Sequence, residues 1–123
     1  MIDHVLIYVI DLEKGKHFYQ KIFEPLGYAI SFGEEGNFWS FDVGDGALFE
    51  IAQHKGNDTL TPCHIAFLVQ SKEQIHEFHS QALKAGGRCN GEPGPRPQYT
   101  KNYYAAFIID PNGHNIEAVL AIE

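Results

Sequence analysis

The chain has 123 residues, a formal net charge of −7 and 44% hydrophobic residues. This length predicts one domain that folds without the help of cross-links. Its nine Lys and Arg residues form no cluster, which argues against nucleic acids and anionic membrane surfaces as partners. The longest apolar stretch, residues 5–10, falls far short of the ~20 residues that span a bilayer, and residues 1–4 carry no signal-peptide pattern. A cytoplasmic protein is therefore expected.

The first half of the chain predicts a strand, a helix and three further strands. Residues 4–9 form a short run rich in Val and Ile, which is typical of a strand buried on both faces. After Asp11, apolar residues recur at three- and four-residue spacing, as they do on one side of an amphipathic helix. Asp11 can cap this helix, and Pro25 and Gly27 end it. The strands of this half are expected at residues 4–9, 28–32, 38–43 and 47–53.

The second half repeats the same plan. Ser71 and Gln74 match a capping box, which predicts the start of a helix after the strand at residues 64–69. Gly86 and Gly87 end that helix. A short strand near Arg88 is then expected, followed by a long irregular stretch, because residues 90–97 are rich in Pro and Gly. The last strands are expected at residues 103–109 and 115–122, joined by a type I turn at residues 110–113.

The two halves are related by an internal repeat. With an offset of 60 positions His4 falls on His64, and with an offset of 67 Glu50 falls on Glu117. The order β-α-β-β-β thus occurs twice, which predicts an α+β fold whose two βαβββ modules form curved mixed sheets around a central cavity. We expect a single domain over residues 1–123, with modules at about 1–53 and 62–123 and a crossover at 54–61.

His4, His64, Glu50 and Glu117 form the candidate site. Imidazole nitrogens and carboxylate oxygens are metal ligands, and two buried carboxylates are costly to hold close together unless a cation lies between them. The repeat-equivalent positions predict that two His and two Glu converge on one divalent ion. The alternatives are hydrogen-bonded structural His residues, solvent-facing Glu residues, or an inherited repeat that has lost its ion or its second ligand pair.

The remaining His and Cys residues rank lower as site candidates. His114 follows the turn at residues 110–113, and a solvated turn residue is expected there. Cys63 and Cys89 lack a CxxC spacing and are interpreted as buried free thiols. The other His residues lie on the predicted helices or in the crossover and do not repeat: His17, His54, His76 and His79.

Three segments together resemble the vicinal oxygen chelate superfamily, namely HVLIYV at residues 4–9, HIAF at residues 64–67 and DPNGHNIE at residues 110–117. This superfamily contains glyoxalase I, extradiol dioxygenases, and fosfomycin- and bleomycin-resistance proteins. The segment YYAAF at residues 103–107 looks like an uncharacterised glyoxalase-like subgroup. The resemblance covers nearly the whole chain and implies paired βαβββ modules around a divalent ion.

The resemblance implies a ligand set and an assembly. His4, His64 and Glu117 would bind the metal, and Glu50 matches the fourth ligand position of glyoxalase I. The ion would be Zn, Ni, Co, Mn or Fe, all of which accept mixed His and carboxylate ligation. The resemblance also implies a homodimer.

Three functions are consistent with this ligand set. The first is a metal-dependent lyase or isomerase of glyoxalase type, in which Glu50 or Glu117 takes and returns a carbon-bound proton of a small substrate with vicinal oxygens. The second is an extradiol-type, ring-cleaving dioxygenase with His4, His64 and Glu117 as a facial triad. The third is a non-catalytic ligand-binding protein of bleomycin-resistance type. Five aromatic residues could line the cavity or belong to the plain core: Tyr8, Trp39, Tyr99, Tyr103 and Tyr104.

Overall fold

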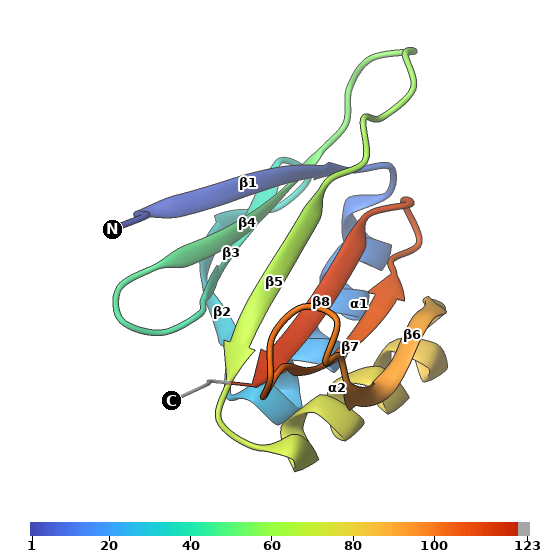
Figure 1. The fold of residues 1–123 in the computed structure, drawn as a ribbon. Helices are drawn as coiled ribbons and strands as arrows, with labels where there is room; N and C mark the ends of the chain where they lie inside the picture. The colour runs from blue at the N-terminus through green and yellow to red at the C-terminus, as the bar shows by residue number, and fades with distance from the viewer. Residues whose placement is uncertain (121–123) are drawn as a thin grey trace. The chain divides into compact units, whose positions relative to one another are not determined.

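The computed structural model describes residues 1–120, and the chain divides into two compact units, Met1–Thr61 and Pro62–Glu123. Within the described residues each unit contains one α-helix and one four-stranded mixed sheet (Figure 1). The predicted α+β class and its two βαβββ modules are therefore confirmed. No helix in residues 1–120 is both long enough and apolar enough to cross a bilayer.

The N-terminal unit has the sheet order β1-β4-β3-β2, in which β1 and β4 are parallel and the other pairs antiparallel. Asp11 caps the helix by accepting a hydrogen bond from the Lys14 amide at 3.1 Å. The helix then tightens into a 3₁₀ turn that carries Pro25, and Gly27 ends it with φ of 78°. The elements are β1 (His4–Val9), α1 (Leu12–Phe23), η1 (Glu24–Leu26), β2 (Ala29–Glu34), β3 (Phe38–Asp42) and β4 (Leu48–Gln53).

The C-terminal unit has the corresponding order β5-β8-β7-β6, again with its first and last strands parallel. Ser71 caps its helix by accepting a hydrogen bond from the Gln74 amide at 3.2 Å. Residues 121 and 122 of the predicted last strand lie outside the described residues. The elements are β5 (His64–Val69), α2 (Lys72–Lys84), β6 (Arg88–Pro95), β7 (Tyr104–Ile109) and β8 (Asn115–Leu120).

Each unit buries one face of its sheet against its own helix. In the N-terminal unit Phe23 on α1 lies at the centre of an aromatic cluster, with ring centroids 5.1–5.5 Å from those of Tyr19, Tyr28, Phe41 and Phe49. The prediction that residues 4–9 are buried on both faces is wrong. Val9 is fully buried on the helix side, whereas alternate residues on the opposite face remain exposed, since the helix of the unit covers one face only: Leu6 and Tyr8 are 41% and 52% exposed.

The Pro- and Gly-rich stretch after Arg88 is a strand, which corrects the expectation of irregular structure over residues 90–97. β6 continues to Pro95 as the edge of its sheet, with register shifts between Cys89 and Gly91 and between Gly91 and Gly94. Edge strands and bulges tolerate Pro because its missing N–H is not needed for pairing there.

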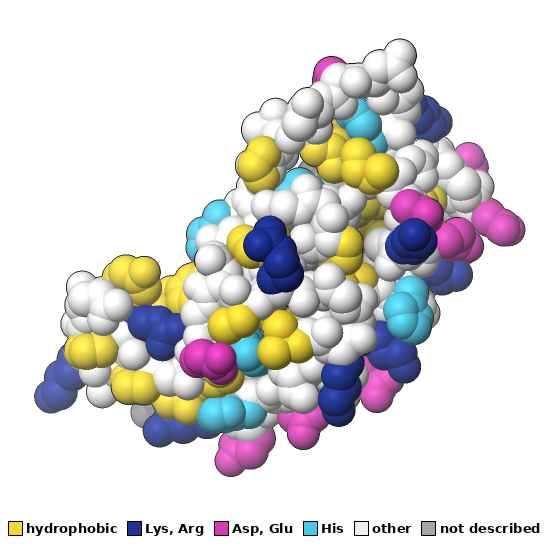
Figure 2. Space-filling model, turned by 90° about the vertical axis from the view of Figure 1, so that its right-hand side faces the viewer, with side chains coloured by type: hydrophobic (Ala, Val, Ile, Leu, Met, Phe, Trp, Pro, Cys, Tyr) yellow, Lys and Arg dark blue, Asp and Glu magenta, His cyan; other side chains and the backbone are white. Residues whose placement is uncertain are grey.

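On the face shown in Figure 2, acidic and basic side chains are interspersed rather than gathered by sign. This distribution is consistent with the lack of a Lys and Arg cluster in the sequence.

Candidate functional site

The first and last strands of each unit carry one His and one Glu on the same face. In the N-terminal unit His4 pairs with Leu48, and Glu50 lies two residues further along β4. In the C-terminal unit His64 pairs with Asn115, and Glu117 lies two residues further along β8. Residues paired across strands, and residues two apart on a strand, share a face. The structure therefore brings His4 together with Glu50 (the N-terminal pair) and His64 together with Glu117 (the C-terminal pair).

The C-terminal pair is in direct contact. His64 Nε2 lies 3.0 Å from Glu117 Oε1. The Glu117 carboxylate is only 2% exposed, and the Tyr103 hydroxyl donates a hydrogen bond to its other oxygen, Oε2. A buried carboxylate is stable only when such partners replace its hydration. Tyr103 therefore holds one oxygen of Glu117, and the other oxygen faces the His64 ring.

The tautomer of His64 follows from its second contact. Its Nδ1 lies 3.0 Å from the Asn115 carbonyl oxygen, which can only accept a hydrogen bond, so Nδ1 carries a proton. The ring also stacks on Phe107 at 6.1 Å with an interplanar angle of 19°. In the neutral imidazole Nε2 then presents a lone pair toward an anionic oxygen. Two acceptors at 3.0 Å need a proton or a metal cation between them.

The N-terminal pair is more open. His4 Nδ1 lies 2.7 Å from Asp3 Oδ1, and half of the His4 side chain is exposed. The hydrogen bond with Asp3, and next the nearby charge of Glu50, raise the pKa of His4 above 6.5. The Asp3 contact occupies Nδ1 and leaves Nε2 for another partner, which is the arrangement expected of a metal-binding imidazole.

Glu50 lines a cleft of about 470 Å³ within the N-terminal unit. Tyr8 also lines this cleft, and so the suggested cavity-lining role of Tyr8 is consistent with the structure. Apolar walls with a few polar groups are typical of small-molecule sites. The cleft is lined by Leu6, Tyr8, Asn37, Phe38, Glu50, Ala52, Gln53 and Lys55.

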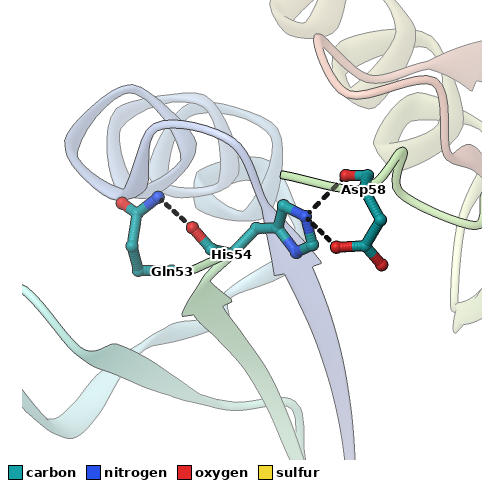
Figure 3. Close-up of polar contacts among 3 residues, drawn as sticks. All are labelled: Gln53, His54 and Asp58. Atoms are coloured by element: carbon teal, nitrogen blue, oxygen red, sulfur yellow. Dashed lines mark hydrogen bonds and ion pairs between the residues drawn. The ribbon is translucent and has the colours of Figure 1, made fainter. Parts of the chain in front are cut away.

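The chain around the cleft is fixed by Gln53 and His54 (Figure 3). The Gln53 amide nitrogen donates to the carbonyl oxygens of Ile10 at 2.7 Å and His54 at 3.0 Å. His54 Nε2 bonds the Asp58 carbonyl at 2.9 Å and lies 3.5 Å from the Asp58 carboxylate. The His54 ring meets Tyr8 edge-on at 6.4 Å. These contacts position Tyr8 and the segment after β4.

Two buried polar atoms beside the His–Glu pairs have no hydrogen-bond partner among residues 1–120. Ser40 Oγ belongs to the residue opposite Glu50 in the β3–β4 register. Asn115 Oδ1 belongs to the residue opposite His64 in the β5–β8 register. Buried polar groups are normally satisfied, so such an atom points to a polar ligand, ion or water. One such atom lies beside each His–Glu pair, and this supports a polar ligand at each pair.

The donor set fits a divalent metal ion. The ligands offered are neutral imidazole nitrogens and carboxylate oxygens, which suit Zn, Mn, Fe, Co and Ni. Metal bonds of roughly 2.0–2.2 Å at right angles place their two ligand atoms about 3 Å apart. The 3.0 Å separation of His64 Nε2 and Glu117 Oε1 agrees with that spacing.

Two of the remaining sequence interpretations change. His114 is buried at 2% exposure, and its Nδ1 accepts a hydrogen bond from the Cys63 amide at 3.1 Å, so the expected solvated turn residue is wrong. The reason is the turn itself, where Asp110 Oδ1 accepts from the amides of Asn112 and His114 and directs His114 inward. Both thiols are free as expected, but neither is fully buried, since Cys63 is half-buried and Cys89 is exposed.

Other suggested cavity-lining residues lie elsewhere, and some partners were missed. Trp39 packs under the Lys16 ammonium at 4.1 Å, and Tyr104 bonds His76 at 2.8 Å. The sequence did not predict that the Tyr103 hydroxyl bonds Glu117. Tyr103 lies in a loop fourteen positions before Glu117, and no spacing rule connects two such positions. The Asp3 contact with His4 had a signal, since a carboxylate directly precedes the imidazole in the sequence.

Sequence and structure comparisons agree on the family. A sequence model of the Glyoxalase/Bleomycin resistance protein/Dioxygenase superfamily matches residues 1–118. The chain therefore belongs to this superfamily, whose members usually bind a metal ion. No curated protein matches the chain in sequence.

Solved structures share the fold over nearly the full length. A glyoxalase/bleomycin resistance protein from Albidiferax ferrireducens T118 has 28% identity and a TM-score of 0.86, covering 98% of this chain and 99% of that one. A glyoxalase/bleomycin resistance protein/dioxygenase family enzyme from Burkholderia phytofirmans PsJN has 17% identity and a TM-score of 0.74, covering 98% of each chain. A lactoylglutathione lyase from Agrobacterium tumefaciens has 17% identity and a TM-score of 0.73, covering 98% and 93%.

The Tyr103–Glu117 contact predicts a late-titrating phenol. Burial, and then the hydrogen bond to Glu117, raise the pKa of Tyr103 to about 12. The neutral phenol is thus favoured in the folded chain, and its stabilisation is present below pH 10 and lost as the pH rises through about 12. The tyrosinate absorbance of chelator-treated protein is read just after a rapid pH jump. It should include one phenol that ionises near pH 12, and this late ionisation should be missing in Tyr103→Phe. Tyr99→Phe is the matched control and should keep it. A wild-type minus Tyr103→Phe difference curve centred near pH 10 would contradict this prediction.

Proposed function

We propose that the chain is a divalent-metal-dependent lyase or isomerase of glyoxalase type that acts on a small substrate with oxygens on adjacent carbons. In this proposal His4, Glu50, His64 and Glu117 bind the ion, which is Zn, Ni, Co, Mn or Fe. The main support is the repeated His–Glu pair: it stands at the same register in both units, and the C-terminal pair is already in contact at 3.0 Å.

The two pairs differ in their surroundings, and this difference suggests different roles. Glu117 is buried and held by Tyr103 and His64, so it suits a fixed ligand. Glu50 is half-buried and lines the cleft, so it suits the carboxylate that removes a carbon-bound proton and returns it to the neighbouring carbon. The ion, when bound, supplies Lewis-acid polarisation of the substrate oxygens.

The cleft residues limit what the substrate can be. Leu6, Tyr8 and Phe38 offer apolar contacts, and Lys55 offers a cation that would bind an anionic group of the substrate. A compact oxygenated molecule with a small apolar part and a negative charge fits this lining.

The comparisons support this class of activity without fixing it. One protein of the same fold is named a lactoylglutathione lyase. The ring-cleaving dioxygenase, with His4, His64 and Glu117 alone as ligands, and the non-catalytic binding protein remain the alternatives. The carboxylate in the cleft favours the lyase or isomerase, because proton transfer between carbons needs a base at the substrate whereas ring cleavage needs only the triad.

Protein purified without chelators should carry close to one divalent ion per set of four ligands. His64→Ala should lose the ion bound by these four ligands, because this change removes a ligand and leaves Glu117 Oε1 without its contact. His17→Ala, at an exposed position on α1, is the control and should keep its full metal content. Elemental analysis of both variants decides the matter, and full metal retention in His64→Ala would remove His64 from the site.

Glu50→Gln should lower kcat by about 10²–10⁴-fold, because an amide cannot carry the proton. The assay is turnover of adducts formed between 2-oxoaldehydes and thiols, both glutathione and smaller thiols, with metal content measured in parallel. If Glu50→Gln keeps the metal content of the wild type and both proteins consume oxygen with catechols, the activity is that of the dioxygenase. Ligand binding without turnover and without metal would assign the binding protein. Either result would overturn the lyase proposal.

We also propose a homodimer, in which the ligands of one ion come from one chain or from two copies. Light scattering after size exclusion at micromolar concentration should give twice the 13.8 kDa chain mass. A monomer at this concentration would exclude ligand sharing between copies.

A further inference from the structure

A second cluster of metal-ligand side chains lies in the C-terminal unit, on the sheet face covered by α2. His79 on α2 places Nε2 3.2 Å from Cys89 Sγ on β6 and 3.9 Å from Glu92 Oε2 on the same strand. The three ligand atoms all lie within 4.8 Å of one another. His79 is buried at 6% exposure, whereas the Glu92 side chain is 79% exposed. One ligand is thus fixed in the core, and one side is open for an ion to enter.

The separations are those of ligands around one tetrahedral ion. With metal bonds of about 2.3 Å to sulfur and about 2.0–2.2 Å to nitrogen and oxygen, tetrahedral geometry places N and S roughly 3.6 Å apart and N and O roughly 3.4 Å apart. The observed N–S distance of 3.2 Å and N–O distance of 3.9 Å are close enough to these values that small side-chain rotations can close the difference. Glu92, being exposed, can make that adjustment without moving the backbone.

The bulge in β6 is what places Cys89 and Glu92 on one side. Residues three apart on a regular strand point to opposite faces. Cys89 pairs with Ile108, but Gly91 pairs with Phe107, so β6 uses one residue more than β7 between these points. The extra residue reverses the alternation, and Cys89 and Glu92 both face the helix side, where Ile108 is buried. Bulges commonly re-aim a side chain in this way.

Arg96 fixes the same stretch of β6. Its guanidinium donates to the carbonyl oxygens of Glu92 at 2.7 Å, Gly94 at 2.9 Å and Pro95 at 3.2 Å. It also lies over the Phe107 ring at 5.4 Å. The backbone that carries Glu92 is therefore held by Arg96, which lies on the Phe107 side of β6, away from the cluster.

We propose that His79, Cys89 and Glu92 form a second metal site, for Zn²⁺ or a similar borderline-soft divalent ion, with water as the fourth ligand. The thiolate distinguishes this site from the His–Glu pairs, which offer only nitrogen and oxygen. The bound ion would tie α2 to the edge strand β6, whose outer side lacks a neighbouring strand within residues 1–120. The net charge of −7 favours cation uptake.

Titration of the reduced, full-length protein with Co²⁺ under anaerobic conditions tests this proposal. A thiolate ligand gives cobalt a near-ultraviolet charge-transfer band that nitrogen and oxygen ligands do not give. The band should appear in the wild type, disappear in Cys89→Ser and persist in Cys63→Ser, the matched control for the other free thiol. It should also persist in His64→Ala, and so failure of the proposed catalytic site and failure of this site are distinguishable.

Glu92→Gln provides the second variant, because an exposed side chain can be changed without unfolding the chain. Loss of an outer-shell partner of a metal already weakens binding about 10–100-fold, so loss of this ligand should raise the Co²⁺ dissociation constant by at least that factor. A wild-type protein without the band, or a band that survives Cys89→Ser, overturns the site. An unchanged dissociation constant in Glu92→Gln overturns the three-ligand set.

Discussion

The parallel pairing of the first and last strands in each unit is the constraint on which the proposed site depends. A slip of one residue would turn Glu50 or Glu117 toward the helix and bury an anion among apolar side chains. The apolar residues on the helix side prevent that slip. Ile51 follows Glu50 and Ile116 precedes Glu117 in the sequence, and both isoleucines are fully buried. The packing of the core thus fixes the position of the polar pair on the other face.

The same register holds two unequal pairs. In the C-terminal unit Tyr103 donates to one oxygen of Glu117 and His64 lies against the other, and burial makes any change of partner costly. In the N-terminal unit Glu50 stands at a cleft, and His4 is half-exposed beside Asp3. A duplicated framework therefore provides one rigid anchor and one accessible carboxylate. Metal-assisted proton transfer needs both, because the ion must stay fixed while the base meets the substrate.

Much of the fold could be predicted from the sequence, because the strands, caps and helix stripes are local patterns. Residues 4–9 and 64–69 form β1 and β5 as expected, and Asp11 and Ser71 are the caps. The repeat offset pointed to His64 and Glu117 as site candidates, and the structure places their side chains 3.0 Å apart. The exposed side of β1 was missed, because a run of apolar residues does not reveal which faces a helix covers. The burial of His114 was missed because it depends on hydrogen bonds to Asp110.

The Cys89–Glu92 arrangement shows why some clusters escape sequence reasoning. Strict alternation separates the two residues, and only the extra residue in β6 reunites them on the side of His79. The sheet of the C-terminal unit then carries nitrogen and oxygen ligands on its open face and a thiolate cluster on its helix face. Ligands of different softness prefer different ions. The two faces can therefore hold different metals.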